Sequence, residues 1–164
     1  MPNSITDLHE VVDILNTLDT SADSGPDNPH EDSNQISLII DPCGIDAWAI
    51  FPNRLMAVLY IKTYSDCKKE KFFYMTELGK AIVGPWNDAT KTHVSPRYRD
   101  PFNDGWLRID NVNYRVNEFT YTHFNGPHSS DEDVRNATWF AQWGVEVRIL
   151  FNGQYYRVKP KANK

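Results

Sequence analysis

Cysteine, long apolar runs and, at the N-terminal end, positive charge are all scarce in this sequence. Cys43 and Cys67 are the only cysteines, too few for a four-cysteine zinc site or a disulfide scaffold. We expect two free thiols, with one disulfide as the alternative. No apolar run approaches the ~18 residues of a membrane span, and the N-terminus lacks the basic and apolar regions of a signal peptide. The sequence therefore predicts a soluble protein, cytoplasmic as made, with no membrane partner.

Motifs that hold cofactors or form common catalytic sites are missing as well. The chain contains no Gly-x-Gly-x-x-Gly, no Walker loop, no His-Glu-x-x-His and no Gly-x-Ser-x-Gly. We therefore expect no cofactor, no metal and no catalytic residues, and predict that the protein is not an enzyme.

The two parts of the chain differ in charge. Residues 1–34 hold eight acids and no Lys or Arg, so the remainder carries 22 − 8 = 14 acids against 17 bases. An acidic arm is thus joined to a mildly basic body. Such asymmetry indicates a charged partner or arm–body contact, and a solvated arm is the alternative.

The arm begins with a predicted helix. Ser4 can cap it, and one stripe then carries the apolar side chains Ile5, Leu8, Val12 and Leu15. A helix of this length is marginal alone in water, so the stripe must dock on its own domain or on another chain. We predict a helix over 1–19, an acidic linker over 20–34 and a single β-rich domain over 35–164.

Two hairpins are predicted in the C-terminal third. The segment Val145–Pro160 alternates apolar and polar residues around Asn152-Gly153, which favours a type I′ turn. Upstream, Trp106–Asp110 leads through Asn111 into Val112–Phe124 in the same way.

Further strands are predicted nearer the N-terminus. Segments 35–40, 45–51 and 54–63 are expected to form a three-strand meander with the third strand central, and Asp41-Pro42-Cys43-Gly44 to form a type I turn. Phe72–Met75 is expected to be a strand, while Thr76–Val83 fits a short helix or a turn and strand equally. Pro85–Gly105 is a loop long enough to indicate a function.

These elements predict an α+β fold that is mainly antiparallel β. We expect a small barrel or sandwich of about 7–9 strands, with the N-terminal amphipathic helix on its acidic arm laid across it.

The long loop carries a basic segment that is a candidate for phosphate or nucleic-acid contact. It consists of Lys91, His93, Arg97, Tyr98 and Arg99. Arginines suit phosphate oxygens and a tyrosine can stack on a base. Pairing with the acidic arm, or with Asp100 and Asp104, explains the segment equally well, and a pI near 5.5 disfavours a dedicated nucleic-acid binder.

Histidines offer two weaker candidates. His93-Val94-Ser95 and His128-Ser129-Ser130 resemble the paired His-x-Ser/Thr pattern of two-histidine phosphoesterases, a resemblance that implies imidazole acid and base with hydroxyls on the phosphate. A metal alternative would use His123 and His128 with Asp131, Glu132 and Asp133, but His-x4-His in a loop is not a usual chelating spacing.

Aromatic residues concentrate at Trp139, Phe140 and Trp143. In a strand, the two tryptophans would share one face and Phe140 would point to the other. An exposed side would suit protein contact, although core packing alone also explains the cluster.

We therefore predict a non-enzymatic structural or interaction protein, a subunit or adaptor of a larger assembly, with a virus or phage particle as one setting. Its partners would be other protein subunits, in a homo- or hetero-oligomer, contacted through the N-terminal arm and the aromatic surfaces. One alternative is a small regulator or inhibitor of a protein or nucleic acid, in which the acidic arm covers the basic loop. The other is a hydrolase using His93 and His128.

Overall fold

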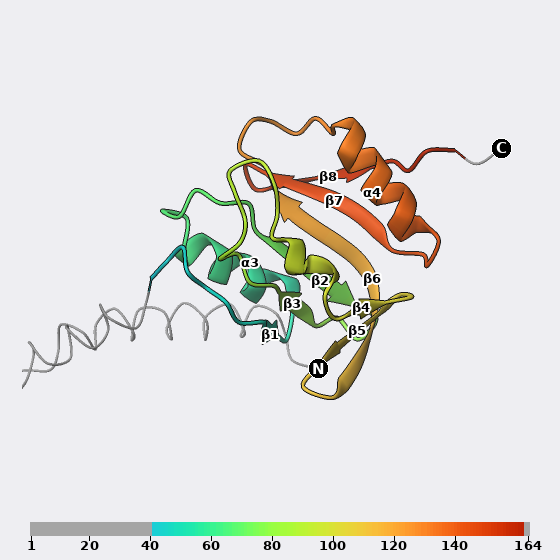
Figure 1. Cartoon of the computed structure of the whole chain (residues 1–164), viewed down its shortest axis with the longest axis horizontal. Coiled ribbons are helices and arrows are strands. Elements are labelled where there is room, and N and C mark those ends of the chain that lie inside the picture. Colours follow the sequence, from blue (N-terminus) through green and yellow to red (C-terminus); the bar gives the residue numbers. More distant parts are fainter. Residues whose placement is uncertain (1–40, 163–164) are drawn as a thin grey trace, which may run out of the picture.

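The computed structural model describes residues 41–162 and shows one open sheet with a helix on each face (Figure 1). Eight strands form this sheet in the order β1-β3-β2-β6-β5-β4, with β7 paired to β6 and β8 paired to β7. The strands are β1 (Ala49–Phe51), β2 (Phe72–Thr76), β3 (Ala81–Val83), β4 (Phe102–Asn103), β5 (Trp106–Ile109), β6 (Val112–Thr122), β7 (Glu146–Phe151) and β8 (Gln154–Val158). The helices are α3 (Arg54–Thr63), α4 (Asp131–Ala141) and a short 3-10 helix, η1 (Pro96–Arg99). The predicted helix over 1–19, the acidic linker and the strand over 35–40 lie outside the described residues.

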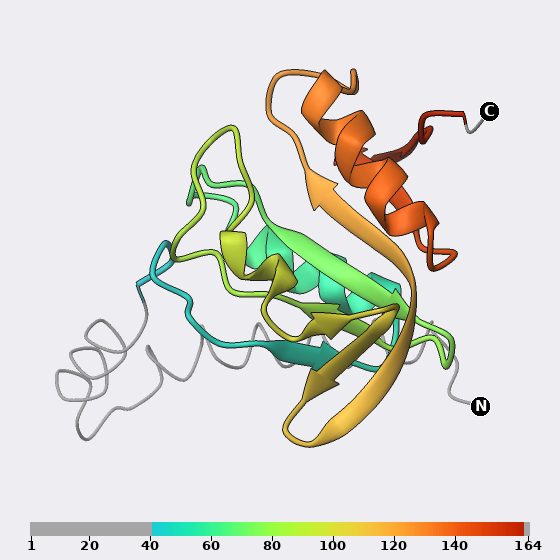
Figure 2. The same cartoon turned by 45° about the vertical axis from the view of Figure 1, so that its right-hand side comes forward.

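Alternation along β2 explains why both faces of the sheet are covered. Phe72 and Tyr74 belong to one apolar cluster, which includes Phe140 of α4. Phe73 and Met75 belong to the other, which includes Ala57 and Ile61 of α3. Because successive strand residues point to opposite faces, α3 and α4 lie on opposite sides of the sheet (Figure 2). Every residue of β2 is buried, as expected for a strand covered on both faces.

The long strand β6 joins the parts of the sheet. Its first half pairs with β5, and its second half lies between β2 and β7. The β6–β7 pair is parallel, with Phe119 opposite Val147, whereas the other pairs are antiparallel. Parallel neighbours need a crossover connection, and α4 supplies it.

The predicted number of strands and the mainly β character are confirmed by the described residues, but the barrel or sandwich is wrong. Residues 41–162 form a mixed, unclosed sheet in which β1 and β8 each pair with one strand only. The parallel pairing of β6 with β7 could not be read from strand patterns alone.

The predicted third strand of the meander is helix α3. The Asn53 side chain accepts a hydrogen bond from the Met56 backbone N–H at 3.0 Å and caps the helix. The run from Leu55 to Ile61 is apolar almost throughout, so it carries neither a clear helical nor a clear strand period. The central strand is β2 rather than this segment.

The aromatic residues that we expected in a strand lie on or beside helix α4. Ser130 and Asp133 form a capping box, in which each side chain accepts from the backbone N–H of the other residue. Asp131, Glu132 and Asp133 occupy the first turn, where the helix dipole favours negative charge.

Both hairpins are confirmed. Asn152 and Gly153 have φ of 51° and 77°, and Asp110 and Asn111 have φ of 50° and 67°, the pattern of type I′ turns. A hydrogen bond of 3.0 Å from Gly44 N–H to the Asp41 carbonyl closes the predicted turn there. The open alternative over 76–83 is resolved as a turn followed by β3.

Cys43 and Cys67 form a disulfide, so the expectation of free thiols is wrong. The Cα atoms lie 5.2 Å apart across a sequence separation of 24. Sequence spacing carried no information about this pairing, because it is the fold that places the turn at 41–44 beside the residues following α3.

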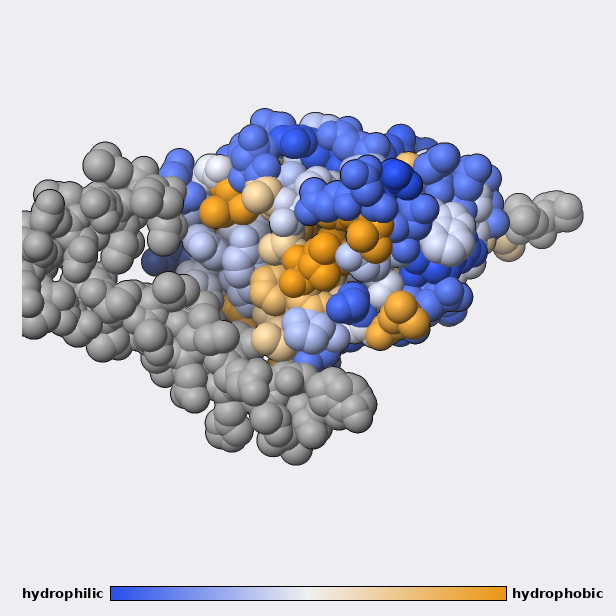
Figure 3. All heavy atoms as spheres, turned by 90° about the horizontal axis from the view of Figure 1, so that it is seen from below, coloured by the Kyte–Doolittle hydropathy of each residue, from blue (hydrophilic) through white to orange (hydrophobic). Residues whose placement is uncertain are grey.

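Exposed large apolar side chains in the described region are Ile50, Leu55, Leu78, Trp106, Val112, Phe124 and Tyr156. Figure 3 shows that apolar residues also gather into a continuous area on one face of the domain, bordered by hydrophilic residues.

Within residues 41–162 no helix is long and apolar enough to cross a membrane.

Candidate functional site

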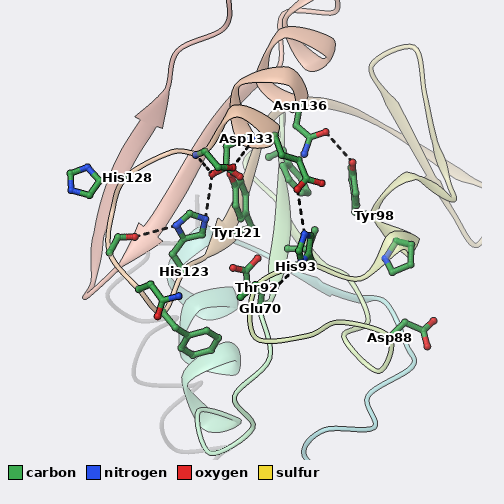
Figure 4. A pocket seen from close by; sticks show the side chains of 18 residues that line it. Glu70, Asp88, Thr92, His93, Tyr98, Tyr121, His123, His128, Asp133 and Asn136 are labelled. Atoms are coloured by element: carbon green, nitrogen blue, oxygen red, sulfur yellow. Dashed lines mark hydrogen bonds and ion pairs between the residues drawn. The ribbon is translucent and has the colours of Figure 1, made fainter.

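The candidate site is a cleft of about 610 Å³ beside the N-terminal end of α4. Its walls come from the long loop before η1, the end of β6, the connection 123–130 and the first turn of α4 (Figure 4). It therefore lies beyond the carboxyl end of β6, next to its parallel neighbour β7. Ligands of α/β proteins commonly bind at this place, where a crossover helix begins. We call it the acidic cleft.

Asp133 anchors the α4 wall of the cleft. Its carboxylate accepts a short hydrogen bond from the Tyr121 hydroxyl and a 2.7 Å bond from the Ser130 backbone N–H. The Nε2 atom of His123 lies 3.7 Å from Asp133 Oδ2, and the other ring nitrogen lies 3.1 Å from the Gly126 carbonyl oxygen. Burial and the Asp133 carboxylate both raise the pKa of Tyr121, so the tyrosine keeps its proton. These contacts fix the inner wall.

Glu70 differs from the other acids because its side chain has no hydrogen-bond or ion-pair partner among the described residues. The residue is only 5% exposed, and it lines the cleft immediately before β2. Figure 4 shows its carboxyl group directed towards the space between His123 and His93. Burial, together with the negative charges of Asp133 and Glu132, raises the pKa of Glu70 to about 8. Among the described residues only Asn87 Oδ1 is an enclosed side-chain atom without a partner, so the Glu70 carboxyl group opens to the cleft, where a ligand can pair with it.

The opposite wall carries His93. Its Nε2 atom lies 3.3 Å from Glu132 Oε1, and its Nδ1 atom shares a hydrogen bond of 2.9 Å with the Thr92 hydroxyl. His93 is exposed, so this pair is open to solvent and contributes little to stability.

The lining of the cleft carries four acidic residues but no Lys or Arg. The acids are Glu70, Asp88, Glu132 and Asp133. The imidazoles are those of His93, His123 and His128, and the first two already face an acid. Within residues 41–162, Glu70 and Asp88 have no ion-pair partner.

Aromatic rings complete the lining. Tyr98, Phe119, Tyr121 and Phe124 contribute to it. The faces of such rings attract cations, and this attraction is larger where water is excluded. The lining therefore favours a ligand that combines a positive charge with an apolar body. The buried acid and the other carboxylates would attract the charge, and the aromatic rings would contact the apolar body.

The basic segment of the sequence is spread over several local contacts. Arg97 pairs with Asp46 and also lies 3.3 Å from Asp100, and Arg99 lies over the ring of Trp139 at 4.5 Å. The Tyr98 ring packs in the core, 5.2 Å from that of Phe119. Arg97 is therefore partly neutralised by nearby acids.

Of the remaining basic-segment residues, Lys91 is exposed and His93 turns to the acidic cleft. The five residues therefore do not form one continuous basic face. Phosphate or nucleic-acid contact by this segment stays a prediction.

The three aromatic candidates share the surroundings of α4 but differ in exposure. Phe140 is fully buried and stacks on Phe119 at 4.9 Å. Trp139 and Trp143 are partly exposed and lie 5.6 Å each from Phe102. Only the two tryptophans are available to a partner. The arm residues Ile5, Leu8, Val12 and Leu15 lie outside the described residues.

The structure brings His93 and His128 to the same cleft but not together. Figure 4 shows them on opposite sides of His123. The neighbouring hydroxyls have structural roles: Ser95 caps η1 and is fully buried, and Ser130 caps α4. In the part of the chain that the structure describes, no group of three or more His, Cys, Asp or Glu residues could hold a metal ion.

Sequence reasoning missed Glu70 and Tyr121, the residues that define the cleft floor. Glu70 sits in a charged stretch that predicts a loop, and Tyr121 sits in a strand, so neither has a local pattern that predicts a site. The acids of α4 were noticed, but only as a metal alternative.

Comparison of the chain with protein-family models, with characterised proteins and with solved structures finds no match. The site must therefore be interpreted from its own geometry.

Proposed function

We propose that the protein is a non-enzymatic interaction protein whose acidic cleft binds a primary ammonium group carried on a hydrocarbon chain. Such a group is presented by a lysine side chain of a partner or by a free organic amine. The observation that carries the proposal is the unpartnered, buried carboxyl group of Glu70 facing the cleft.

Charge and shape support this ligand class. Without a ligand Glu70 is mostly protonated at pH 7, because its pKa is about 8, and a nearby ammonium ion would favour its ionised form. The ammonium ion would then lie between the carboxylates of Glu70 and Asp133, while its hydrocarbon body would contact rings such as those of Phe119 and Phe124. An anionic ligand would instead enter a lining that has four acids and no Lys or Arg.

Titration of the protein with n-butylammonium tests the proposal. We expect amide resonances around Glu70 and Asp133 to shift at about millimolar ligand, the range normal for so small a probe. The uncharged analogue n-butanol should cause much smaller shifts. Glu70→Gln should weaken n-butylammonium binding at least tenfold, whereas Glu77→Gln, an exposed acid on the β2–β3 turn, serves as the matched control. Equal binding of the two probes would contradict the proposal.

A hydrolase is the second candidate, favoured by the placement of His93 and His128 in one cleft. Its weakness is electrostatic, because a phosphate ester would have to approach Glu132 and Asp133. Hydrolysis of p-nitrophenyl phosphate that is lost in both His93→Ala and His128→Ala would establish it. Activity that survives both changes, or no activity at all, would remove it.

That the protein is a subunit of a larger assembly, contacting neighbours through Ile5, Leu8, Val12 and Leu15, remains a prediction from the sequence. The solution mass of the full chain and of the Leu8→Asp, Val12→Asp double variant tests it by light scattering. Assembly that is lost in the variant would support it, and a monomer in both cases would oppose it.

A further inference from the structure

Helix α3 presents an apolar face that does not pack on the domain. Ala57 and Ile61 are buried against the sheet. Leu55 is 38% exposed, Met56 and Leu59 are half-buried, and none of the three belongs to either apolar cluster. At 100° per residue these three lie on the side opposite Ala57 and Ile61. A helix that is apolar on all sides is normally buried on all sides, so the outer face of α3 calls for a covering segment.

The position at which the described chain begins indicates what covers this face. Asp41 is two residues before Cys43, whose disulfide partner Cys67 follows the last residue of α3 by four positions. Residues 1–40 therefore join the domain beside the C-terminal end of α3. The stripe of the arm ends at Leu15, so 40 − 15 = 25 residues connect it to Asp41. A chain of this length can reach up to about 80 Å, and the ten-residue helix is only about 15 Å long, so the connection is long enough to bring the stripe to any part of α3.

The arm and the outer face of α3 are also complementary in polarity and charge. The arm offers an apolar stripe of about the same length as α3 and is acidic elsewhere, with eight acids and no Lys or Arg in residues 1–34. In the last turn of α3 and the residues that follow it, the exposed charges are those of Lys62, Asp66 and Lys68. Apolar contact along the stripe would therefore place acids of the arm near two lysines and one acid at its margin.

We propose that Ile5, Leu8, Val12 and Leu15 pack on the outer face of α3 formed by Leu55, Met56 and Leu59 of the same chain. Tethering decides between the same chain and a neighbour. Two segments tethered in one chain meet at an effective concentration of about millimolar, which exceeds the micromolar concentrations at which proteins are usually handled. The arm is then a part of the domain surface rather than a bridge between subunits. This proposal does not depend on the acidic cleft.

Amide NMR spectra of three full-length proteins test the proposal. The first is the unaltered chain, the second carries Leu8→Asp and Val12→Asp, and the third carries Thr6→Asp and Thr17→Asp. The third is the matched control, because it adds the same two charges on the opposite side of the predicted stripe. We expect the α3 amides to shift and to exchange their hydrogens at least tenfold faster in the second protein only. The α4 amides should be unaffected in all three.

A change on the other side of the contact makes the test reciprocal. Leu59→Asp should shift the amides of residues 5–15, and adding Leu8→Asp and Val12→Asp to it should cause no further change in α3. Spectra of α3 that do not respond to the arm variants would overturn the proposal. A solution mass of two chains that falls to one chain in Leu59→Asp would also overturn it, because the face would then bind a second copy.

Discussion

Arg54 and Glu118 are joined by two parallel hydrogen bonds of 2.5 and 2.8 Å, which connect the first residue of α3 to the middle of β6. Glu118 is 5% exposed and also accepts a 2.6 Å bond from the Thr120 hydroxyl. Burial alone would raise the pKa of Glu118, but the hydrogen bonds from Arg54 and Thr120 and the nearby Arg148 outweigh it and lower the pKa. The carboxylate is thus held charged within the sheet.

Because Arg54 pairs with the buried carboxylate of Glu118, its removal should lower the stability of the protein. Arg54→Ala leaves the buried carboxylate of Glu118 with Arg148 as its one charged partner and with the Thr120 hydroxyl bond, and we expect the free energy of unfolding to fall by about 3 kcal/mol. Arg157→Ala removes an arginine whose side chain is 58% exposed and lies 3.9 Å from Glu146. As a matched control it should change stability by less than about 0.5 kcal/mol. Urea unfolding of both variants at pH 7 is the measurement, and equal losses would contradict the expectation.

Glu70 should make the stability of the protein depend on pH in the opposite sense to most acids. Its pKa is about 8 in the folded protein against an ordinary 4.5, so the folded state binds a proton that the unfolded state releases. The contribution is fully present below pH 4.5 and is lost as the pH rises through 8.

Glu70→Gln should remove this loss. Since each pKa unit corresponds to about 1.4 kcal/mol, we expect the variant to be more stable than the parent by roughly 2–5 kcal/mol at pH 9. Near pH 5 the two proteins should have similar free energies of unfolding. Unfolding curves between pH 5 and 9 measure the difference, with Glu77→Gln as control. If the free energy of unfolding changed with pH in the same way in the parent and in Glu70→Gln, the raised pKa of Glu70 would be contradicted.

Gly84 should not tolerate a side chain. A Cβ atom at this position would lie 2.0 Å from the Phe72 ring, and Phe72 is fully buried between neighbouring aromatic rings. Gly84→Ala should therefore destabilise the domain by about 3 kcal/mol through overpacking. Gly153→Ala tests backbone conformation alone, because nothing lies within 4 Å of its Cβ although its φ is 77°. It should cost about 1 kcal/mol. Thermal unfolding distinguishes the two.

The disulfide should contribute to stability through the unfolded state. For cysteines 24 residues apart, the chain-entropy estimate is about 3 kcal/mol. We expect the Cys43→Ser, Cys67→Ser double variant to unfold at a correspondingly lower denaturant concentration. Addition of a reducing agent should bring the parent to the same midpoint and leave the double variant unchanged.

How far the sequence predicts this structure depends on whether local chemistry decides the element. The turns at Asn152-Gly153 and Asp110-Asn111 were predictable, because positive φ at two successive positions restricts the residues allowed there. The run from Leu55 to Ile61 was not, because packing on the sheet rather than a local period selects its helix. Capping by Asn53 is the one local indication that it offered.

The acidic cleft, too, could be predicted from the sequence only in part. Ser130 and Asp133 carry a capping pattern that indicates the start of α4, and the His-x-Ser pattern pairs His93 with His128. Their meeting with Glu70 and Tyr121 depends on β2 and β6 lying side by side, with Phe72 opposite Tyr121. Strand pairing across such a separation is a property of the whole fold, which no local pattern of residues contains.

The bond between Cys43 and Cys67 also determines what a protease can release. Helix α3 lies entirely between the two cysteines, so a cut anywhere in 44–66 opens the backbone without separating the fragments. The chain up to the cut stays covalently attached to the sheet through Cys67, and it leaves only after reduction. Under oxidising conditions the N-terminal arm can therefore be lost only by cleavage before Cys43.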